Sequence, residues 1–175
     1  EWHNNPYSEL ISAEEVYSDA EVWEYQKQQY RYLIARFGHS RSLGIWEFIN
    51  EMNGTDGWMN GRREEAFNWV EKMQQYFAEN DPYRHPTTAN FSGGYQEYRP
   101  RLYEPIDVPN IHIYSSQGWP MEYRNDELRS SLYNYGWAAR RFWNNFEKPA
   151  VFGEAGALHT YVDPNSGGYS TTFHN

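Results

Sequence analysis

The sequence contains no cysteine, and that absence excludes several kinds of site at once. Without thiols the chain has no disulfide framework, no cysteine-ligated zinc site and no thiol nucleophile. Basic residues are also scarce: 15 Lys and Arg stand against 24 Asp and Glu, giving a formal net charge of −9. A nucleic-acid partner requires a basic patch that displaces the counterions of phosphate, so this charge balance argues against such a partner.

Long hydrophobic runs are missing as well. No apolar segment approaches the roughly 20 residues that cross a bilayer, so we expect no membrane span. Aromatic residues are abundant instead: 8 Trp, 16 Tyr and 9 Phe make up 19% of the 175 residues. Aromatic rings stack on the CH faces of sugars and also line Tyr-rich protein interfaces. Composition alone therefore leaves both kinds of partner open.

Hydrophobic periodicity predicts one domain, residues 1–175, with three amphipathic helices. The first begins at Ser18, which forms a capping box with Glu21, and it ends at Gly38. The other two helices and four strands are predicted at about 62–79 and 125–146, and at 43–50, 86–91, 108–114 and 150–153. Because strands separated by helices need crossover connections, we predict an α/β fold with a parallel sheet.

Two carboxylates lie at the ends of predicted strands. The first strand leads into Asn50 and Glu51, and the fourth leads into Glu154. In a parallel α/β sheet, the carboxyl ends of the strands are where the functional loops converge. A single Glu at a strand end is usually a solvated loop residue, but a pair flanking one bond is what glycoside hydrolysis requires. The pair predicts a glycosidase site.

The strand between these carboxylates alternates in polarity. Asn110, His112 and Tyr114 share one face, and the two intervening isoleucines share the other. Glu47 has the same parity as Glu51, so we expect both on the interior face. We interpret Glu47 as a buried, hydrogen-bonded or ion-paired residue and not as a third catalytic group.

Several segments together resemble the clan A glycoside hydrolases, the cellulase- and mannanase-like (β/α)8 barrels. The run WEFINE at 46–51 is similar to the fourth-strand signature of the clan. The run PAVFGE at 149–154 is similar to its seventh-strand nucleophile motif, and HIY at 112–114 to its sixth-strand His-x-Tyr. Residues 31–38 and 42–44 resemble the helix and turn that lead into the fourth strand. The motifs occur in the clan's order, with helix-sized gaps between them.

The resemblance implies a role for each matching residue. Glu51 would be the general acid/base and Glu154 the nucleophile of a retaining mechanism. Asn50 would hold the sugar 2-hydroxyl, Tyr114 would donate a hydrogen bond to Glu154, and His112 would line the same subsite. The implied substrate is a β-linked glucan- or mannan-like oligo- or polysaccharide, with no cofactor. Members of the clan are commonly secreted, although the sequence itself leaves the location open.

Three tryptophans are candidates for sugar platforms. Trp2, Trp58 and Trp119 lie in predicted loops on the catalytic side. Tryptophan also anchors loops to cores, so each of the three has a structural alternative.

The predicted strands fill only half of a barrel. A (β/α)8 barrel has eight strands and typically about 250 residues, and four strands are predicted here. By resemblance, 1–7 is similar to the loop after the clan's third strand and 173–175 to the start of the helix after its seventh. A half-barrel exposes two unpaired edges, which favours association. We therefore expect a partial TIM barrel that is completed by self-association, most simply as a homodimer or otherwise as a higher homo-oligomer.

Other functions stay open at this point. The clan's missing strands supply an Arg, a His and a Trp to the sugar subsite, and nothing here matches them. A non-catalytic carbohydrate-binding pseudoenzyme and an oligomerising half-barrel scaffold are the alternatives to a hydrolase. A metal enzyme is disfavoured because the six histidines show no compact ligand spacing, so we predict no metal site.

Overall fold

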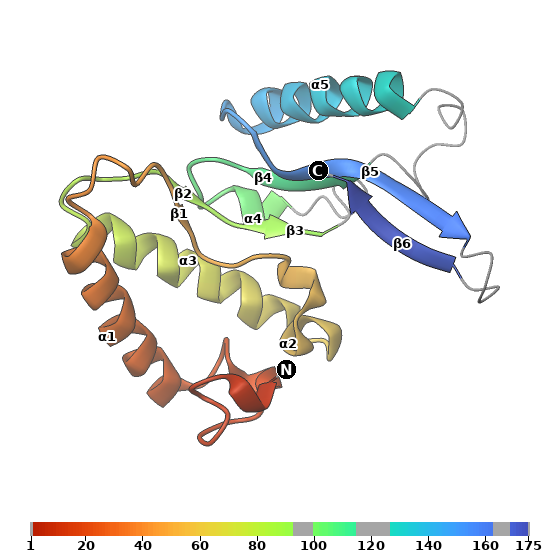
Figure 1. Ribbon diagram of the computed structural model, residues 1–175. Helices are drawn as coiled ribbons and strands as arrows, with labels where there is room; N and C mark the ends of the chain where they lie inside the picture. Colours follow the sequence, from red (N-terminus) through yellow and green to blue (C-terminus); the bar gives the residue numbers. More distant parts are fainter. Residues whose placement is uncertain (1, 93–99, 115–126, 163–168, 175) are drawn as a thin grey trace.

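The computed structural model describes residues 2–92, 100–114, 127–162 and 169–174, and it has the expected α/β architecture (Figure 1). Its helices are α1 (Ala20–Phe37), α2 (Asp56–Met59), α3 (Arg63–Asn80), α4 (Pro100–Tyr103) and α5 (Glu127–Phe146), with short 3-10 helices η1 (Trp2–Asn4), η2 (Ala13–Glu15) and η3 (Met52–Gly54). Its strands are β1 (Trp46–Glu47), β2 (Thr87–Thr88), β3 (Asn90–Phe91), β4 (Asn110–Tyr114), β5 (Val151–Val162) and β6 (Tyr169–His174). No helix in these described ranges is long and apolar enough to span a bilayer.

Parallel strands occupy all four predicted positions. β1 pairs in parallel with β2, β3 with β4, and β4 with the first half of β5. Only Ala89 separates β2 from β3, so these two short strands together fill the position predicted at 86–91. Figure 1 shows α5 along β4 and β5, while α1 and α3 pack against each other beside β1 and β2. This arrangement is consistent with part of a (β/α)8 barrel.

The C-terminal strand corrects the prediction of a wholly parallel sheet. β5 continues past its predicted end at Gly153, and residues 157–162 pair antiparallel with β6. The expectation that the segment 173–175 begins a helix is therefore wrong for its described residues, Phe173 and His174, because both belong to β6. The physical reason is composition: β6 consists largely of β-branched and aromatic residues, which favour extended backbone.

The start of α1 lies two residues later than predicted. Asp19, not Ser18, is the N-cap, and its carboxylate accepts a hydrogen bond from the backbone N–H of Val22 at 2.8 Å. Aspartate and serine cap helices about equally well, so periodicity alone could not choose between neighbouring candidates. The predicted end is confirmed, because the N–H of Gly38 donates to the carbonyl of Ile34 at 2.8 Å.

The core forms between α3, the sheet and the short helices. The predicted apolar stripe of α3 is confirmed, since all five of its members are buried: Ala66, Trp69, Val70, Met73 and Phe77. The predicted stripe of α1 is partly wrong, because Phe37 is exposed and Gln26 is buried. The Gln26 side chain accepts a hydrogen bond from the indole Nε1 of Trp69 at 2.8 Å, which satisfies two polar groups inside the core.

Trp58 belongs to this core, and the expectation that it is a sugar platform is wrong. It lies in α2, is 3% exposed, and packs against Phe67 and Phe91 with ring-centroid distances of 5.3 and 5.0 Å. Trp2 is half-buried, and its Nε1 donates to the carbonyl of Ile11 at 3.2 Å, so this indole anchors the N-terminal segment to its neighbour.

Asp81 joins the end of α3 to the sheet. Its carboxylate accepts hydrogen bonds from the Trp46 indole at 3.0 Å, from the backbone of Tyr83 and His85, and it bonds the His85 ring nitrogen at 2.8 Å. Burial by itself opposes ionisation of this carboxyl. The hydrogen bonds from His85, Trp46 and Tyr83 outweigh burial, and the pKa of Asp81 lies below its usual value of 3.8. Asp81 is therefore a buried ionised group with its acceptor sites filled.

We expect Trp58→Ala to destabilise the fold and not merely to weaken ligand binding. Truncating a buried tryptophan leaves a cavity and costs about 3–5 kcal/mol in the free energy of unfolding. Trp143→Ala is the matched control, because this tryptophan is 59% exposed on α5; we expect it to cost at most about 0.5 kcal/mol. Urea denaturation of both variants measures the difference, and equal effects would contradict the assignment of Trp58 to the core.

We expect Asp81 to make the protein sensitive to acid. Because the folded-state pKa of Asp81 is lowered, its contribution to stability is present above the unfolded value near 3.8 and is lost as pH falls below it. Asp81→Asn should cost about 1–3 kcal/mol at neutral pH and flatten the pH dependence below pH 4. Thermal melts from pH 7 to pH 2 test this, with the exposed Asp56→Asn as control; parallel profiles for wild type and Asp81→Asn would refute it.

Candidate active site

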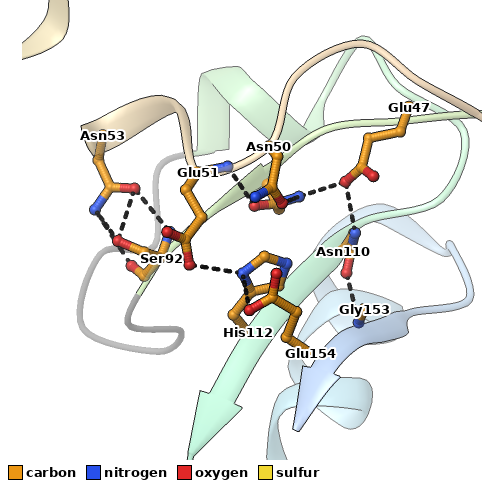
Figure 2. Close-up of polar contacts among 10 residues, drawn as sticks. Glu47, Asn50, Glu51, Asn53, Ser92, Asn110, His112, Gly153 and Glu154 are labelled. Carbon is orange, nitrogen blue, oxygen red and sulfur yellow. Dashed lines mark hydrogen bonds and ion pairs between the residues drawn. The ribbon is translucent and has the colours of Figure 1, made fainter. Parts of the chain in front are cut away.

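Two carboxylates meet at one imidazole nitrogen, as the sequence predicted they would share one cleft. The Nδ1 atom of His112 in β4 lies 2.8 Å from Oε1 of Glu51 and 3.5 Å from Oε2 of Glu154 (Figure 2). One such atom from each of the three side chains lies within 4.8 Å of the other two. Glu51 follows β1 and Glu154 lies in β5, so the sheet brings together residues from three separate segments.

A register shift in the sheet places Glu154 opposite His112. Ile111 pairs with Phe152 but His112 pairs with Glu154, so Gly153 is the extra residue of a bulge in β5. The N–H of Gly153 donates to Oδ1 of Asn110 at 2.8 Å. A Cβ on this glycine would lie 2.6 Å from the same oxygen, so only glycine permits the approach. The bulge thus aims Glu154 at the histidine.

Glu51 has a backbone conformation that few non-glycine residues adopt. Its φ of 50° and ψ of 55° are in the left-handed region, which costs a non-glycine residue about 1–3 kcal/mol. The N–H of Glu51 donates to Oδ1 of Asn90 at 2.7 Å. Asn90 is 0% exposed, so this bond is shielded from water and helps to hold the unusual conformation.

Asn90 connects the site to Glu47. The Nδ2 group of Asn90 donates to Oε1 of Glu47 and, at 3.2 Å, to Oδ1 of Asn50. Asn110 also donates from its Nδ2 to Oε1 of Glu47, at 3.1 Å. The expectation that Glu47 is hydrogen-bonded is confirmed, whereas the expectation that it is buried is wrong, since its side chain also reaches the surface.

The burial of the three central side chains is unequal. His112 is 1% exposed, whereas the side chains of Glu51 and Glu154 are 37% and 40% exposed. The histidine is therefore fixed inside the sheet while both carboxylates reach the solvent side, where a substrate can contact them. A proton on Nδ1 would be donated to Glu51 and would also favour negative charge on Glu154.

The same trio is the group of possible metal ligands that the described residues contain. A histidine nitrogen and two carboxylate oxygens are ordinary ligands of zinc. Sequence spacing could not reveal this group, because each ligand comes from a different strand position. Its short internal distances are also those of a hydrogen-bonded catalytic trio, so the geometry by itself does not require an ion.

Of the other predicted site residues, Asn50 is exposed beside the pair and accepts a hydrogen bond from Asn90. Tyr114 is part of β4, but its side chain lies outside the described part of the chain, as does all of Trp119. The structure places Trp58 in the core, and it shows Trp2 bonded to Ile11. The platform role of Trp2 stays a prediction.

Sequence reasoning missed three polar residues near the pair. Asn90 follows β2, and Ser92 comes two residues later, directly after β3. The side chain of Asn53 bonds both the backbone N–H and the hydroxyl of Ser92, at 2.7 and 3.0 Å, which ties η3 to the end of β3. The rule that strand ends carry function, applied to the second predicted strand as it was to the first, would have found Asn90.

No family model matches this chain, and no curated protein matches it. Solved structures are similar in fold. Bifidobacterium dentium β-glucuronidase, complexed with coumarin-3-O-glucuronide, matches with a TM-score of 0.58 and 23% identity, over 87% of this chain and 23% of that one. The Lactobacillus rhamnosus β-glucuronidase matches with a TM-score of 0.56 and 18% identity, over 85% and 24% of the two chains.

Bacteroides uniformis β-glucuronidase is similar too, with a TM-score of 0.57 and 16% identity over 83% of this chain and 18% of that one. The chain thus spans between 18% and 24% of the length of these three proteins. At this identity the likeness shows the fold. The resemblance to glycoside hydrolases is therefore confirmed at the level of fold, and the cellulase- or mannanase-like character stays a prediction.

Proposed function

We propose that this chain carries the catalytic pair of a glycoside hydrolase that cleaves β-linked glycosides. The observation that supports this most directly is the meeting of Glu51 and Glu154 at one nitrogen of His112. Glycoside hydrolysis needs two carboxyl groups on either side of the scissile bond. The fold shared with β-glucuronidases adds support, since those enzymes are named for the same class of reaction.

The short separation of the carboxylates favours a retaining mechanism. Retaining pairs are about 5–5.5 Å apart, whereas inverting pairs are about 6.5–9.5 Å apart to leave room for a water molecule. Here an oxygen of Glu51 and an oxygen of Glu154 lie within 4.8 Å. We therefore propose a double displacement in preference to direct attack by water.

In the proposed first step, Glu154 attacks the anomeric carbon while Glu51 donates a proton to the departing oxygen. The glycosidic C–O bond breaks, and an ester bond forms between the sugar and Glu154. In the second step Glu51 removes a proton from water, the water oxygen attacks the same carbon, and the ester bond breaks. Asn50 lies next to Glu51 in the chain, at a position suited to bond the sugar 2-hydroxyl.

The substrate is proposed to be an oligo- or polysaccharide with β-linkages. The sequence motifs favour glucan- or mannan-like chains, and the similar solved structures are β-glucuronidases. Aryl β-glucosides, β-mannosides and β-glucuronides, assayed side by side, distinguish these sugars. Sugar binding without turnover of any of them would support the non-catalytic carbohydrate-binding alternative.

We also propose that the chain self-associates through its open strand edges. In the described residues, β1 pairs only with β2, and the first half of β5 pairs only with β4. Unpaired N–H and C=O groups at such edges are strong sites for strand addition. A homodimer, the simplest assembly, would supply eight parallel strand positions.

We expect Glu51→Gln and Glu154→Gln each to lower turnover of an aryl β-glycoside by at least about 10²–10⁴-fold, because each removes an essential carboxylate. The two roles separate with leaving group. Glu51→Gln should lose less kcat/KM on a dinitrophenyl glycoside than on a methyl glycoside, because dinitrophenolate leaves without a proton. Glu154→Gln should lose kcat/KM on both substrates.

Glu79→Gln is the matched control for these variants, since Glu79 is exposed at the far end of α3 and bonds only its helix neighbour Gln75 among the contacts described. Proton NMR of the first-formed product tests the stereochemistry, and a retained anomeric configuration is expected. Wild-type turnover in either site variant, or an inverted product, would refute the mechanism.

We expect sedimentation velocity to show a species of at least twice the mass of the chain. Charged substitutions at the β1 edge, such as Ile45→Lys, should shift the distribution toward monomer, because charge at an exposed edge opposes pairing. A folded, monodisperse wild-type monomer would contradict self-association and would leave the glycosidase proposal to the activity assay.

A further inference from the structure

We propose that Glu47 is a positioning residue for the catalytic pair: through Asn90 and Asn110, its carboxylate sets the backbone positions from which Glu51 and Glu154 project. The inference rests on the proposed glycosidase function for its activity readout. Glu47 acts through other groups and so is not itself a catalytic residue. The network that carries the inference connects β1, β3, β4 and β5 (Figure 2).

The first step of the argument is the shared acceptor. Oε1 of Glu47 accepts from the side-chain amides of both Asn90 and Asn110. A carboxylate offers acceptor sites and no donor, so it can bind only the NH2 end of each amide. Glu47 therefore decides which way both asparagine side chains are turned.

The second step concerns Asn90. With its NH2 group on Glu47, its Oδ1 atom faces the backbone and accepts the N–H of Glu51 at 2.7 Å. If the amide turned over, two donors would face each other at a residue that is 0% exposed, where water cannot compensate. The orientation of Asn90 thus supports the left-handed conformation of Glu51, with its φ of 50°.

The third step repeats this logic on the other carboxylate. With its NH2 group on Glu47, Asn110 turns Oδ1 toward the N–H of Gly153, the residue before Glu154, at 2.8 Å. Asn110 is also buried, at 4% exposed. A reversed amide would oppose two donors at the bulge that aims Glu154 at His112.

One carboxylate therefore fixes the polarity of two buried amides, and each amide holds the backbone at or next to a catalytic glutamate. A displacement of about 1 Å in such a pair can lower the reaction rate by about 100-fold. Glu47 has this influence although its own side chain is partly in solvent, so changing it should not empty the core.

The first experiment removes the acceptor. We expect Glu47→Leu to lower kcat by about 10–100-fold with KM changed less than threefold, because substrate contacts remain while the pair is misaligned. Glu47→Gln should fall between Glu47→Leu and wild type, since its amide oxygen still accepts but without the charge that strengthens the bonds. Glu79→Leu and Glu79→Gln are the matched controls and should keep wild-type kcat.

The second experiment exchanges donor and acceptor. Asn90→Asp places two carboxylates face to face and should lower kcat by about 100-fold. The double variant E47Q/N90D restores an amide–carboxylate pair of the same shape and formal charge as wild type, and the new amide at position 47 still offers an oxygen to Asn110. We expect it to recover kcat to within about tenfold of wild type, even though the bond from Asn90 to Asn50 is lost.

A spectroscopic readout separates this inference from the proposed function. The ¹⁵N shift of Nδ1 of His112, identified by comparison with His112→Gln, reports the contact with Glu51 whether or not the protein hydrolyses a glycoside. We expect this shift to move in Glu47→Leu and Asn90→Asp and to return in E47Q/N90D, with circular dichroism confirming that each variant is folded.

The outcomes are distinct. An inactive wild type whose His112 shift responds to Glu47 would overturn the glycosidase proposal and support the positioning network. An active wild type whose kcat and His112 shift are unchanged in Glu47→Leu would overturn the role of Glu47. Failure of E47Q/N90D to recover either readout in a folded protein would also overturn it, since the argument rests on amide polarity.

Discussion

The close contact between Gly153 and Asn110 determines which residue of β5 faces β4. Without a side chain at 153, the two backbones approach closely enough for the Gly153 N–H to reach Oδ1 of Asn110 at 2.8 Å. The resulting shift in register pairs His112 with Glu154. In regular register Glu154 would not stand opposite the histidine. The meeting of the two carboxylates therefore depends on the absence of one Cβ atom.

Polar groups stabilise the site where the backbone itself is unfavourable. The left-handed conformation of Glu51 costs about 1–3 kcal/mol, and it persists because a buried amide accepts its N–H. The polar network below the pair is mostly shielded from water, so each donor needs a defined acceptor. Such a network gives the site rigidity on which precise placement of two carboxylates depends, while the carboxylates themselves remain open to solvent.

Local sequence signals predicted much of the framework and failed where packing overruled them. The helix ends at Gly38 and Asp81 followed from strong terminators and are confirmed. Trp58 was expected on the surface, but two aromatic neighbours draw it into the core. The antiparallel β6 was expected to be helical, because a resemblance to whole barrels gives no information about a strand that pairs with the extension of β5.

The sequence by itself determined the alternation of helices and strands, the two glutamates at strand ends and the polar face of the strand between them. Those features follow from periodicity and from short-range chemistry, which a chain carries in its order of residues. Tertiary structure alone decided that His112 bridges both glutamates, that Asn90 and Asn110 share Glu47, and that Gly153 forms a bulge. These contacts join residues 39 to 63 positions apart along the chain, and their register depends on the packing of neighbouring strands, which no local pattern encodes.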